Sequence, residues 1–420
     1  MSEKRLRTVT LDEEKCKGCV ACMKRCPTEA IRVRDKKAKI HFDKCISCGE
    51  CVRICPHHAK KAVYDNLDII NNYKYKIALP APSFFGQFNK IDNLGQVIEG
   101  LKTLGFDEVV EVAKGAELIS DATRKVMKEG KIKKPVISTA CPAILQLILI
   151  RYHSLTDNLL DMLAPVDVVA KMSREKAVQK TGLKAEEIGV FFISPCPAKV
   201  FALKSGLGVV KPVVDGVLSA SEVYLKIISE VKKVKNISEE SQTGVLGFAW
   251  ASSGGEAAGV MKDKYISVDG IENCINILKE IEDNKLDDID FVELNACIGG
   301  CVGGVLNIEN PFVAKSKIRE LRKHLPLSKN NMSSENKNLD YFRWETSPEK
   351  NDVMKLDEDF MVALQKLNKI DEIMKDLPGL DCGNCGAPSC RAFAEDVVNM
   401  EADISLCTRK DEKNEKSSDK

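Results

Sequence analysis

The stretch Asn295-Ala296-Cys297-Ile298-Gly299-Gly300-Cys301-Val302-Gly303-Gly304 carries two cysteines and four glycines directly after an expected strand over 291–294. Two further stretches have the same design, Ser138-Thr139-Ala140-Cys141-Pro142 at the end of an expected strand over 135–139 and Ser194-Pro195-Cys196-Pro197-Ala198-Lys199 after one over 189–193. Open α/β sheets place their sites in the loops at the carboxyl ends of parallel strands. We therefore expect four cysteines to converge on one iron–sulfur cluster: Cys141, Cys196, Cys297 and Cys301.

The alternative for these four cysteines is a place in the apolar core, where free cysteines often lie. One Cys-Pro pair after a strand carries little information, but three such loops in a chain with further cysteine motifs favour a cluster. The glycines after Cys297 let the backbone approach a bulky group, and Lys199 offers a donor to an anionic ligand.

The segment around these loops alternates apolar runs with amphipathic ones, which predicts an α/β domain with largely parallel strands over 71–326. Further strands are expected over 76–79, 108–112 and 243–248, and helices over 94–104, 115–128, 220–234 and 271–281. Cys274 lies at helical spacing with Ile271 and Leu278, so we expect it in the core.

Residues 1–70 contain the pattern CxxCxxCxxxCP twice, from Cys16 to Pro27 and from Cys45 to Pro56. Each run supplies three thiolates to one 4Fe–4S cluster, and its fourth cysteine reaches across to the other cluster. The predicted ligand sets are Cys16, Cys19, Cys22 and Cys55 for one cluster, and Cys45, Cys48, Cys51 and Cys26 for the second. Zinc sites also use CxxC, but the doubled pattern with terminal prolines favours clusters. His57 and His58 are expected at the surface.

This N-terminal segment resembles a bacterial two-cluster ferredoxin of the α+β class, which implies one-electron transfer. Residues 327–355 are polar and are expected to form a linker. A small helical module over 356–412 follows, and the charged end, 413–420, is expected to be disordered.

The C-terminal module carries a fourth set of cysteines, Cys382, Cys385, Cys390 and Cys407. It resembles the small 4Fe–4S domain of several anaerobic redox proteins, which implies a further cluster. Zinc is the competing metal, because a lone four-cysteine site is less distinctive than a doubled one. Phe393, Val397 and Met400 have helical spacing, so a helix is expected to carry the chain back to Cys407.

Composition excludes several classes of function. The net charge is +1, so no overall field favours nucleic acid or an anionic membrane. The longest strongly apolar stretch, Ile144–Ile150, is too short to span a bilayer, and the charged N-terminus has no apolar signal core. We therefore expect a cytoplasmic protein, in which clustered cysteines are metal ligands rather than disulfides.

The three central cysteine loops resemble the signature loops of the catalytic domain of iron-only (FeFe) hydrogenases. The resemblance implies that all four central cysteines hold a 4Fe–4S cluster. It also implies that Cys301 bridges to a di-iron unit with carbonyl, cyanide and azadithiolate ligands. Lys199 matches a family lysine that contacts one cyanide, and Pro82 and Ser83 match the contact to the other. The loop Trp250-Ala251-Ser252-Ser253-Gly254-Gly255 resembles a segment that lines the di-iron pocket, with Trp250 where an aromatic side chain is expected.

This resemblance implies reversible heterolytic cleavage of H2 into protons and electrons, with four 4Fe–4S clusters in all and a redox partner protein or ferredoxin as acceptor. A signalling output would lie in a separate polypeptide. No nucleic acid and no membrane is expected as a partner.

The sequence departs from the family pattern at Ala140, where catalytic members carry a cysteine that relays protons. Alanine has no ionisable group, and such proton transfer is typically worth roughly 10²–10⁴-fold in rate. Ile144 and Asn295 also replace a usual tryptophan and methionine. These changes resemble the divergent, sensory hydrogenases, so we expect low activity used for hydrogen sensing. Glu117 and Asp121 are interpreted as solvated helix charges rather than a proton path.

Two alternatives stay open at this point. One is a ferredoxin-linked catalytic hydrogenase with a different proton route. The other is a hydrogenase-like iron–sulfur scaffold or assembly protein that keeps the four cysteines without the di-iron unit. Pro82, Ser83 and Lys199 favour a real di-iron pocket.

Overall fold

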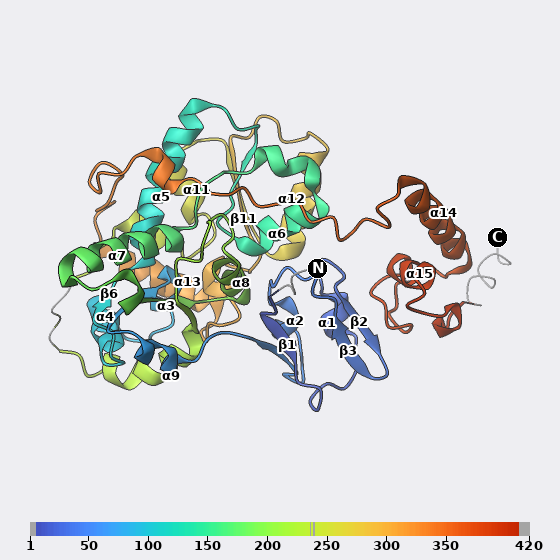
Figure 1. Ribbon diagram of the computed structural model, residues 1–420, viewed down its shortest axis with the longest axis horizontal. Helices are drawn as coiled ribbons and strands as arrows, with labels where there is room; N and C mark the ends of the chain where they lie inside the picture. Colours follow the sequence, from blue (N-terminus) through green and yellow to red (C-terminus); the bar gives the residue numbers. More distant parts are fainter. Residues whose placement is uncertain (1–5, 236, 238–239, 411–420) are drawn as a thin grey trace. The chain divides into compact units, whose positions relative to one another are not determined.

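The computed structural model describes residues 6–235, 237 and 240–410, and the chain divides into two compact units (Figure 1). One unit comprises residues 62–349, and the other combines residues 1–61 with 350–420. The tail expected to be disordered, 413–420, lies outside the described residues. Across the described ranges, no helix has both the length and the apolar composition that a membrane span requires.

Two parallel sheets form the core of the unit 62–349. Their strand orders are β6-β5-β8-β9 and β10-β11-β7. The strands are β5 (Tyr75–Pro80), β6 (Glu108–Val109), β7 (Val136–Ile137), β8 (Ile188–Ser194), β9 (Gly216–Ser219), β10 (Tyr265–Asp269) and β11 (Phe291–Asn295). Strand β8 is buried along its whole length, as a central parallel strand covered on both faces must be. The expected α/β class is confirmed.

The strand register brings predicted site segments to the same end of each sheet. Pro80 at the end of β5 pairs with Ile193 of β8, and Ile137 at the end of β7 pairs with Val292 of β11. The segments that follow these four strands carry the predicted site residues, so each sheet delivers its pair of segments at its carboxyl edge.

Helices follow the strands and cover the sheets. They are α3 (Pro82–Phe85), α4 (Gly95–Lys102), α5 (Val112–Glu129), α6 (Pro142–Arg151), α7 (Pro165–Thr181), α8 (Pro197–Ser205), α9 (Ala220–Val231), α10 (Val245–Ala249), α11 (Gly255–Val260), α12 (Ile271–Glu282) and α13 (Pro311–Leu321). A proline at the first position favours a helix start because its missing N–H is not needed there. Pro142 and Pro197 therefore begin α6 and α8 directly after a cysteine. Cys274 in α12 is fully buried, as expected.

The predicted strand over 243–248 is wrong, because this segment forms helix α10. Glycine lets α10 approach α5 closely: a Cβ atom on Gly247 would lie 2.1 Å from the main-chain oxygen of Ala113. The short apolar run resembles a strand in sequence, and only this tertiary contact favours the helix. Strands β9 and β10 were not among the expected strands.

Most of the segment expected as a linker, residues 327–349, belongs to the unit 62–349. Phe342 is fully buried, and its main-chain oxygen accepts a hydrogen bond of 2.8 Å from Leu163 N–H. Asn330 is buried and donates to the carboxylate of Glu117 at 2.6 Å. Glu117 is itself 1% exposed, so its interpretation as a solvated charge is wrong. A few anchoring side chains suffice to order a stretch whose composition is mostly polar.

The second unit contains the ferredoxin-like module and the C-terminal module. The first has two strand pairs, β1 (Val9–Leu11) with β4 (Lys60–Ala62) and β2 (Ile31–Arg34) with β3 (Lys37–Ile40), and two short helices, α1 (Ala21–Lys24) and α2 (Glu50–Arg53). The second has α14 (Phe360–Asp376) and α15 (Cys390–Val398). His57 and His58 are exposed, as expected. Helix α15 ends before Met400, which is 92% exposed.

Candidate active site

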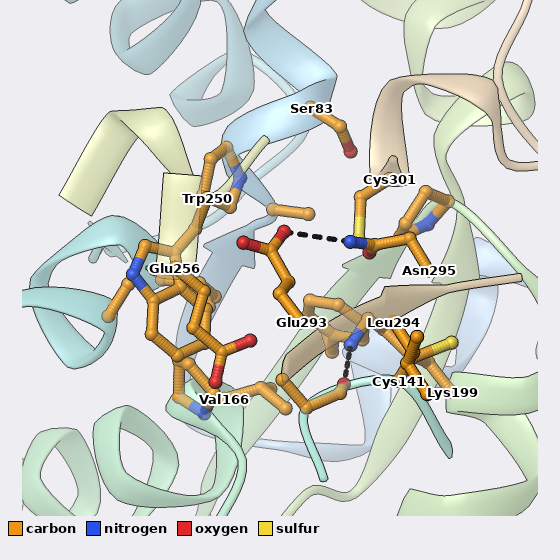
Figure 2. A pocket seen from close by; sticks show the side chains of 18 residues that line it. Ser83, Cys141, Val166, Lys199, Trp250, Glu256, Glu293, Leu294, Asn295 and Cys301 are labelled. Carbon is orange, nitrogen blue, oxygen red and sulfur yellow. Dashed lines mark hydrogen bonds between the residues drawn. The ribbon is translucent and has the colours of Figure 1, made fainter. Parts of the chain in front are cut away.

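One pocket in the unit 62–349 gathers most of the residues that the resemblance places around the di-iron unit (Figure 2). Its lining includes Pro82, Ser83, Ala140, Lys199, Trp250 and Cys301. These residues follow four different strands and the short helix α10, so the sheets and not a single loop build the pocket. Figure 2 shows the Cys301 sulfur and the Ser83 hydroxyl on the same side of the pocket as Asn295.

Three of the four predicted cluster cysteines lie near Lys199. Cys141 and Cys196 directly precede α6 and α8, and Cys301 begins a 3₁₀ turn. The thiols of these three residues all interact electrostatically with the Lys199 ammonium. Cys297 lies in the same loop as Cys301, and a Cβ atom on Gly303 would lie 3.6 Å from its Cβ. Thiols that approach one region from three loops suit a cubane, whose irons need one thiolate at each corner.

Glycine allows the loop after β11 to pack against the loop after α10. Gly300 has a φ of +87°, and a Cβ atom there would lie 2.4 Å from the main-chain nitrogen of Ser253. Ser253 N–H donates to the main-chain oxygen of Gly299 at 3.1 Å, and Val302 N–H donates to that of Ala251 at 2.9 Å. The two loops therefore hold each other at the positions that carry Cys301 and Trp250.

Lys199 is a cation inside the protein. Its Nζ donates to the main-chain oxygen of Ala140 at 3.3 Å. Burial disfavours its charge, but the negative charges of neighbouring groups, the Cys301 thiolate first, outweigh burial, and the pKa of Lys199 lies above its usual value. An ammonium has three donors, so Lys199 has capacity for an anionic ligand in the pocket.

Ser83 supplies the clearest sign that the pocket binds something. The residue is fully buried, and its hydroxyl has no hydrogen-bond partner among the described residues. Leaving a buried polar group unpaired costs about 1–3 kcal/mol. A bound group that accepts hydrogen bonds from Ser83 and Lys199 would satisfy both, and a cyanide-bearing group fits this pair of donors.

Two acidic residues in the lining were missed in the sequence, Glu256 and Glu293. They are 5% and 3% exposed. Burial and the charge of Glu293 raise the pKa of Glu256 to about 8, and burial raises the pKa of Glu293. A signal was present in the sequence, because a glutamate inside the apolar run 291–294 is unusual for a buried strand.

Hydrogen bonds hold these two carboxyl groups near Ala140. The Ser138 hydroxyl donates to Glu256 Oε2 at 2.6 Å and accepts from Ala140 N–H at 3.2 Å. Glu293 Oε1 accepts from Gly254 N–H at 3.0 Å and from Asn295 Nδ2 at 2.8 Å. The pocket therefore holds ionisable groups beside the alanine that lacks one.

The ferredoxin-like module brings its cysteines together in the crossed pattern expected from the sequence. Cys26, Cys45, Cys48 and Cys51 line one cavity. Cys22 interacts electrostatically with Cys16, Cys19 and Cys55. The two crossing cysteines have equivalent surroundings, because Ala30 N–H donates to Cys26 Sγ and Ala59 N–H donates to Cys55 Sγ, both at 3.3 Å.

The cysteines of the C-terminal module also lie close together. Its four cysteines, Cys382, Cys385, Cys390 and Cys407, line a single cavity. Asp381 braces this loop by accepting from Cys390 N–H at 2.6 Å. The donor set contains only thiols around an apolar cavity, which suits an iron–sulfur cluster.

A pocket of cysteines around a half-buried lysine, together with two modules that have cysteine-lined cavities, is typical of an iron–sulfur oxidoreductase. The chain belongs to the iron-only hydrogenase family: residues 74–263 and 200–305 match the family model "Iron only hydrogenase large subunit, C-terminal domain". Residues 8–56 match "4Fe-4S dicluster domain", and residues 377–409 match "Putative Fe-S cluster". The resemblance seen in the sequence is thereby confirmed at the level of the family.

Individual relatives agree with this assignment. Iron hydrogenase 1 of Clostridium pasteurianum is 25% identical over 398 residues, which cover 76% of this chain and 68% of the relative. The structure is also similar to two variants of the FeFe-hydrogenase HydA1 from Chlamydomonas reinhardtii, with a TM-score of 0.52 for each and sequence identities of 16% and 15%. Each match covers 68% of this chain and 98% of the HydA1 chain, and it shows a shared fold.

Proposed function

We propose that this protein cleaves H2 reversibly and heterolytically, turns over slowly and serves hydrogen sensing. The observation that carries the first part is the pocket in which Ser83, Lys199 and Cys301 meet, with a hydroxyl that lacks a partner among the described residues and a half-buried cation. These donors suit an anionic, acceptor-rich group. The scaffold alternative, which lacks such a group, would leave the buried Ser83 hydroxyl without a hydrogen-bond partner among the described residues.

The residues take the following roles. Cys141, Cys196, Cys297 and Cys301 would hold a 4Fe–4S cluster, and Cys301 would also hold a di-iron unit with carbonyl, cyanide and azadithiolate ligands. That unit, when bound, supplies the position at which H2 binds and splits. Lys199 would donate to one cyanide and Ser83, beside Pro82, to the other, and these two contacts would orient the unit. Trp250 fills the wall of the pocket and excludes water.

Ala140 supports slow turnover. It lines the pocket, and its side chain can neither hold nor pass on a proton. Electrons would leave through three further 4Fe–4S clusters, two in the ferredoxin-like module and one in the C-terminal module, to a redox partner protein or ferredoxin. A hydrogen signal would be read by a separate signalling partner.

A specific observation favours a second candidate, a ferredoxin-linked catalytic hydrogenase with a different proton route. Glu256 and Glu293 line the same pocket as Ala140, and the raised pKa of Glu256, about 8, keeps a proton available near neutral pH. Hydrogen evolution from a reduced dye by the fully matured protein separates the two candidates. A low rate supports sensing, and a rate like that of catalytic relatives supports the second candidate.

Infrared spectroscopy tests the cofactor itself. The matured protein is expected to show carbonyl and cyanide bands, and their absence at full iron content would favour the scaffold alternative. Lys199→Met is expected to shift or remove a cyanide band, since it deletes the donor. The matched control is Lys204→Met on the same helix, whose side chain pairs with Asp65 at 2.5 Å instead of lining the pocket.

A further inference from the structure

The cysteine loop of the C-terminal module lies directly against helix α1 of the ferredoxin-like module. A Cβ atom on Gly383 would lie 3.1 Å from Met23 Cε and 3.6 Å from Val20 Cγ1. Val20 belongs to the CxxC stretch 19–22, and Gly383 to the CxxC stretch 382–385. The two ligand-bearing stretches are therefore within one side chain's reach of each other.

A main-chain hydrogen bond joins the two loops at a second point. Val33 N–H in β2 donates to the main-chain oxygen of Gly386 at 2.9 Å. Gly386 has a φ of +80°, and a Cβ atom there would lie 1.9 Å from the Val33 oxygen. Only glycine allows this approach. Gly386, the residue after Cys385, therefore permits both the left-handed turn of the cysteine loop and the close contact of this loop with β2.

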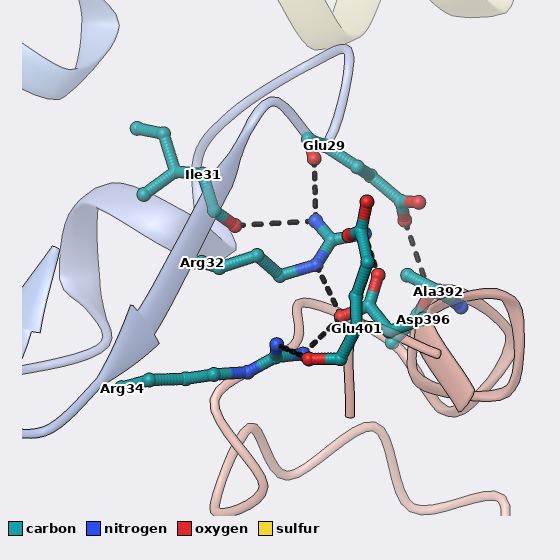
Figure 3. A network of polar contacts seen from close by, with 8 residues as sticks. Glu29, Ile31, Arg32, Arg34, Ala392, Asp396 and Glu401 are labelled. Atoms are coloured by element: carbon teal, nitrogen blue, oxygen red, sulfur yellow. Dashed lines mark hydrogen bonds and ion pairs between the residues drawn. The ribbon is translucent and has the colours of Figure 1, made fainter. Parts of the chain in front are cut away.

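A buried ion pair anchors helix α15 to strand β2 (Figure 3). Asp396 accepts from Arg32 Nε at 2.7 Å and from Arg32 Nη2 at 2.9 Å, and it also pairs with Arg34. The side chains of Arg32 and Asp396 are 6% and 4% exposed. A bidentate arginine–carboxylate pair is directional and strong, and removing one partner leaves a buried charge uncompensated.

A lysine clamps the cysteine loop from the side. Lys24 Nζ donates to the main-chain oxygens of Asp381 and Pro388, the latter at 2.7 Å. Ser389 Oγ donates to Glu29 Oε1 at 3.1 Å. Lys24 lies two residues before Cys26, so the same turn carries cluster ligands and holds the partner loop.

We propose that the C-terminal cluster and the cluster of Cys16, Cys19, Cys22 and Cys55 exchange single electrons across this contact. One cluster is oxidised by one electron as the other is reduced by one. The inference rests on the cluster content proposed above and not on the di-iron unit. The C-terminal cluster would then be the last cluster of the electron-transfer chain. The ion pairs of Asp396 with Arg32 and Arg34 hold its module against the ferredoxin-like module.

Electron paramagnetic resonance of the reduced, full-length protein with reconstituted cubanes tests this proposal, because neighbouring reduced clusters broaden and split each other's signals. The wild type is expected to show an interaction that disappears when Cys382→Ser removes the C-terminal cluster. Asp396→Asn is expected to abolish the same interaction at full iron content, since it removes the charge that holds Arg32 and Arg34. Asp371→Asn is the matched control, an exposed carboxylate of the same module that pairs with Arg391 at 4.0 Å, and should change nothing.

A second variant covers the case in which Asp396→Asn loses iron. Lys24→Met removes an exposed clamp and is expected to weaken the spin interaction with the iron content unchanged. A spin interaction of undiminished strength in Lys24→Met, or one that survives in an iron-replete Asp396→Asn, overturns the proposal. A wild-type signal that is insensitive to Cys382→Ser, as zinc in the C-terminal site would produce, overturns it as well. None of these measurements depends on hydrogenase activity. A failure of this proposal can therefore be distinguished from a failure of the proposed function.

Discussion

Glu256 lies buried beside Glu293, and burial together with that neighbour's charge raises the pKa of Glu256 to about 8. Two carboxyl groups in one apolar pocket cannot both ionise easily, so one tends to keep its proton. Such a pair is suited to hold and pass on a proton where Ala140 offers no carrier.

Glu256→Gln should therefore slow hydrogen turnover. Loss of a general acid–base group typically costs roughly 10²–10⁴-fold in rate, and the measurement is dye-coupled H2 evolution by the matured protein. Glu111→Gln is the matched control, because burial raises the pKa of Glu111 to about 7 while its carboxylate binds Ser241 outside the pocket. Equal rates for wild type and Glu256→Gln would mean that protons take another route.

Ala140→Cys should raise the rate, because a thiol in the pocket lining adds a proton carrier that the alanine lacks. The pH profile of H2 evolution should change with it, since a new titrating group enters the path. Ala140→Ser, of similar size but without a thiol, controls for the change in volume. If neither the rate nor the pH profile changes in Ala140→Cys, proton delivery at this position does not limit turnover.

The stability of the unit 62–349 should fall as pH rises toward 8. Glu256 has a pKa of 4.5 as its reference value and about 8 in the folded chain. Between these values the folded state binds more protons than the unfolded state, so the free energy of unfolding decreases by up to about 1.4 kcal/mol per pH unit. This contribution is complete below pH 4.5 and is lost as pH rises through 8.

Urea midpoints at pH 6 and pH 8 test this expectation. The wild type should lose more stability between the two pH values than Glu256→Gln, which has no proton to lose. Glu111 and Asp167, both with a pKa raised to about 7 by burial, remain in both proteins and cancel in the comparison. A pH dependence equal in the two proteins would contradict the assigned pKa.

Lys60 should raise the reduction potential of the ferredoxin-like clusters. It is 3% exposed, its Nζ has no hydrogen-bond partner among the described residues, and its charge acts on Cys22, Cys51 and Cys55. A positive charge stabilises the reduced, more negative cluster, so Lys60→Met should lower the potential on the order of tens of millivolts. Redox titration followed by paramagnetic resonance measures it.

Lys61→Met provides the comparison for Lys60, because the neighbouring lysine is about half exposed and pairs with Asp12. Solvent screens its charge, and its effect on either cluster should be small. Equal shifts in the two variants would show that the burial of Lys60 is irrelevant to the potential.

The cysteine motifs and the α/β class could be predicted because both depend on short-range order. The spacing of CxxC decides which thiols can reach one cluster, and the alternation of apolar and amphipathic runs decides the sequence of strands and helices. Lys199 and Ser83 were assigned from the resemblance to the hydrogenase family, and the structure places both in the lining of the pocket.

Other features depend on where distant segments meet. Glu256 lies beside Glu293 only because α11 packs on β11. The segment expected as a strand over 243–248 forms helix α10 because Gly247 lets it pack closely against α5. Arg32 and Asp396 are 364 residues apart and meet by the docking of one module on another. The spacing of cysteines along the chain determines which thiols can bind the same cluster. The burial of a side chain, its pKa and the docking of one module on another depend instead on contacts between distant segments, which only the tertiary structure provides.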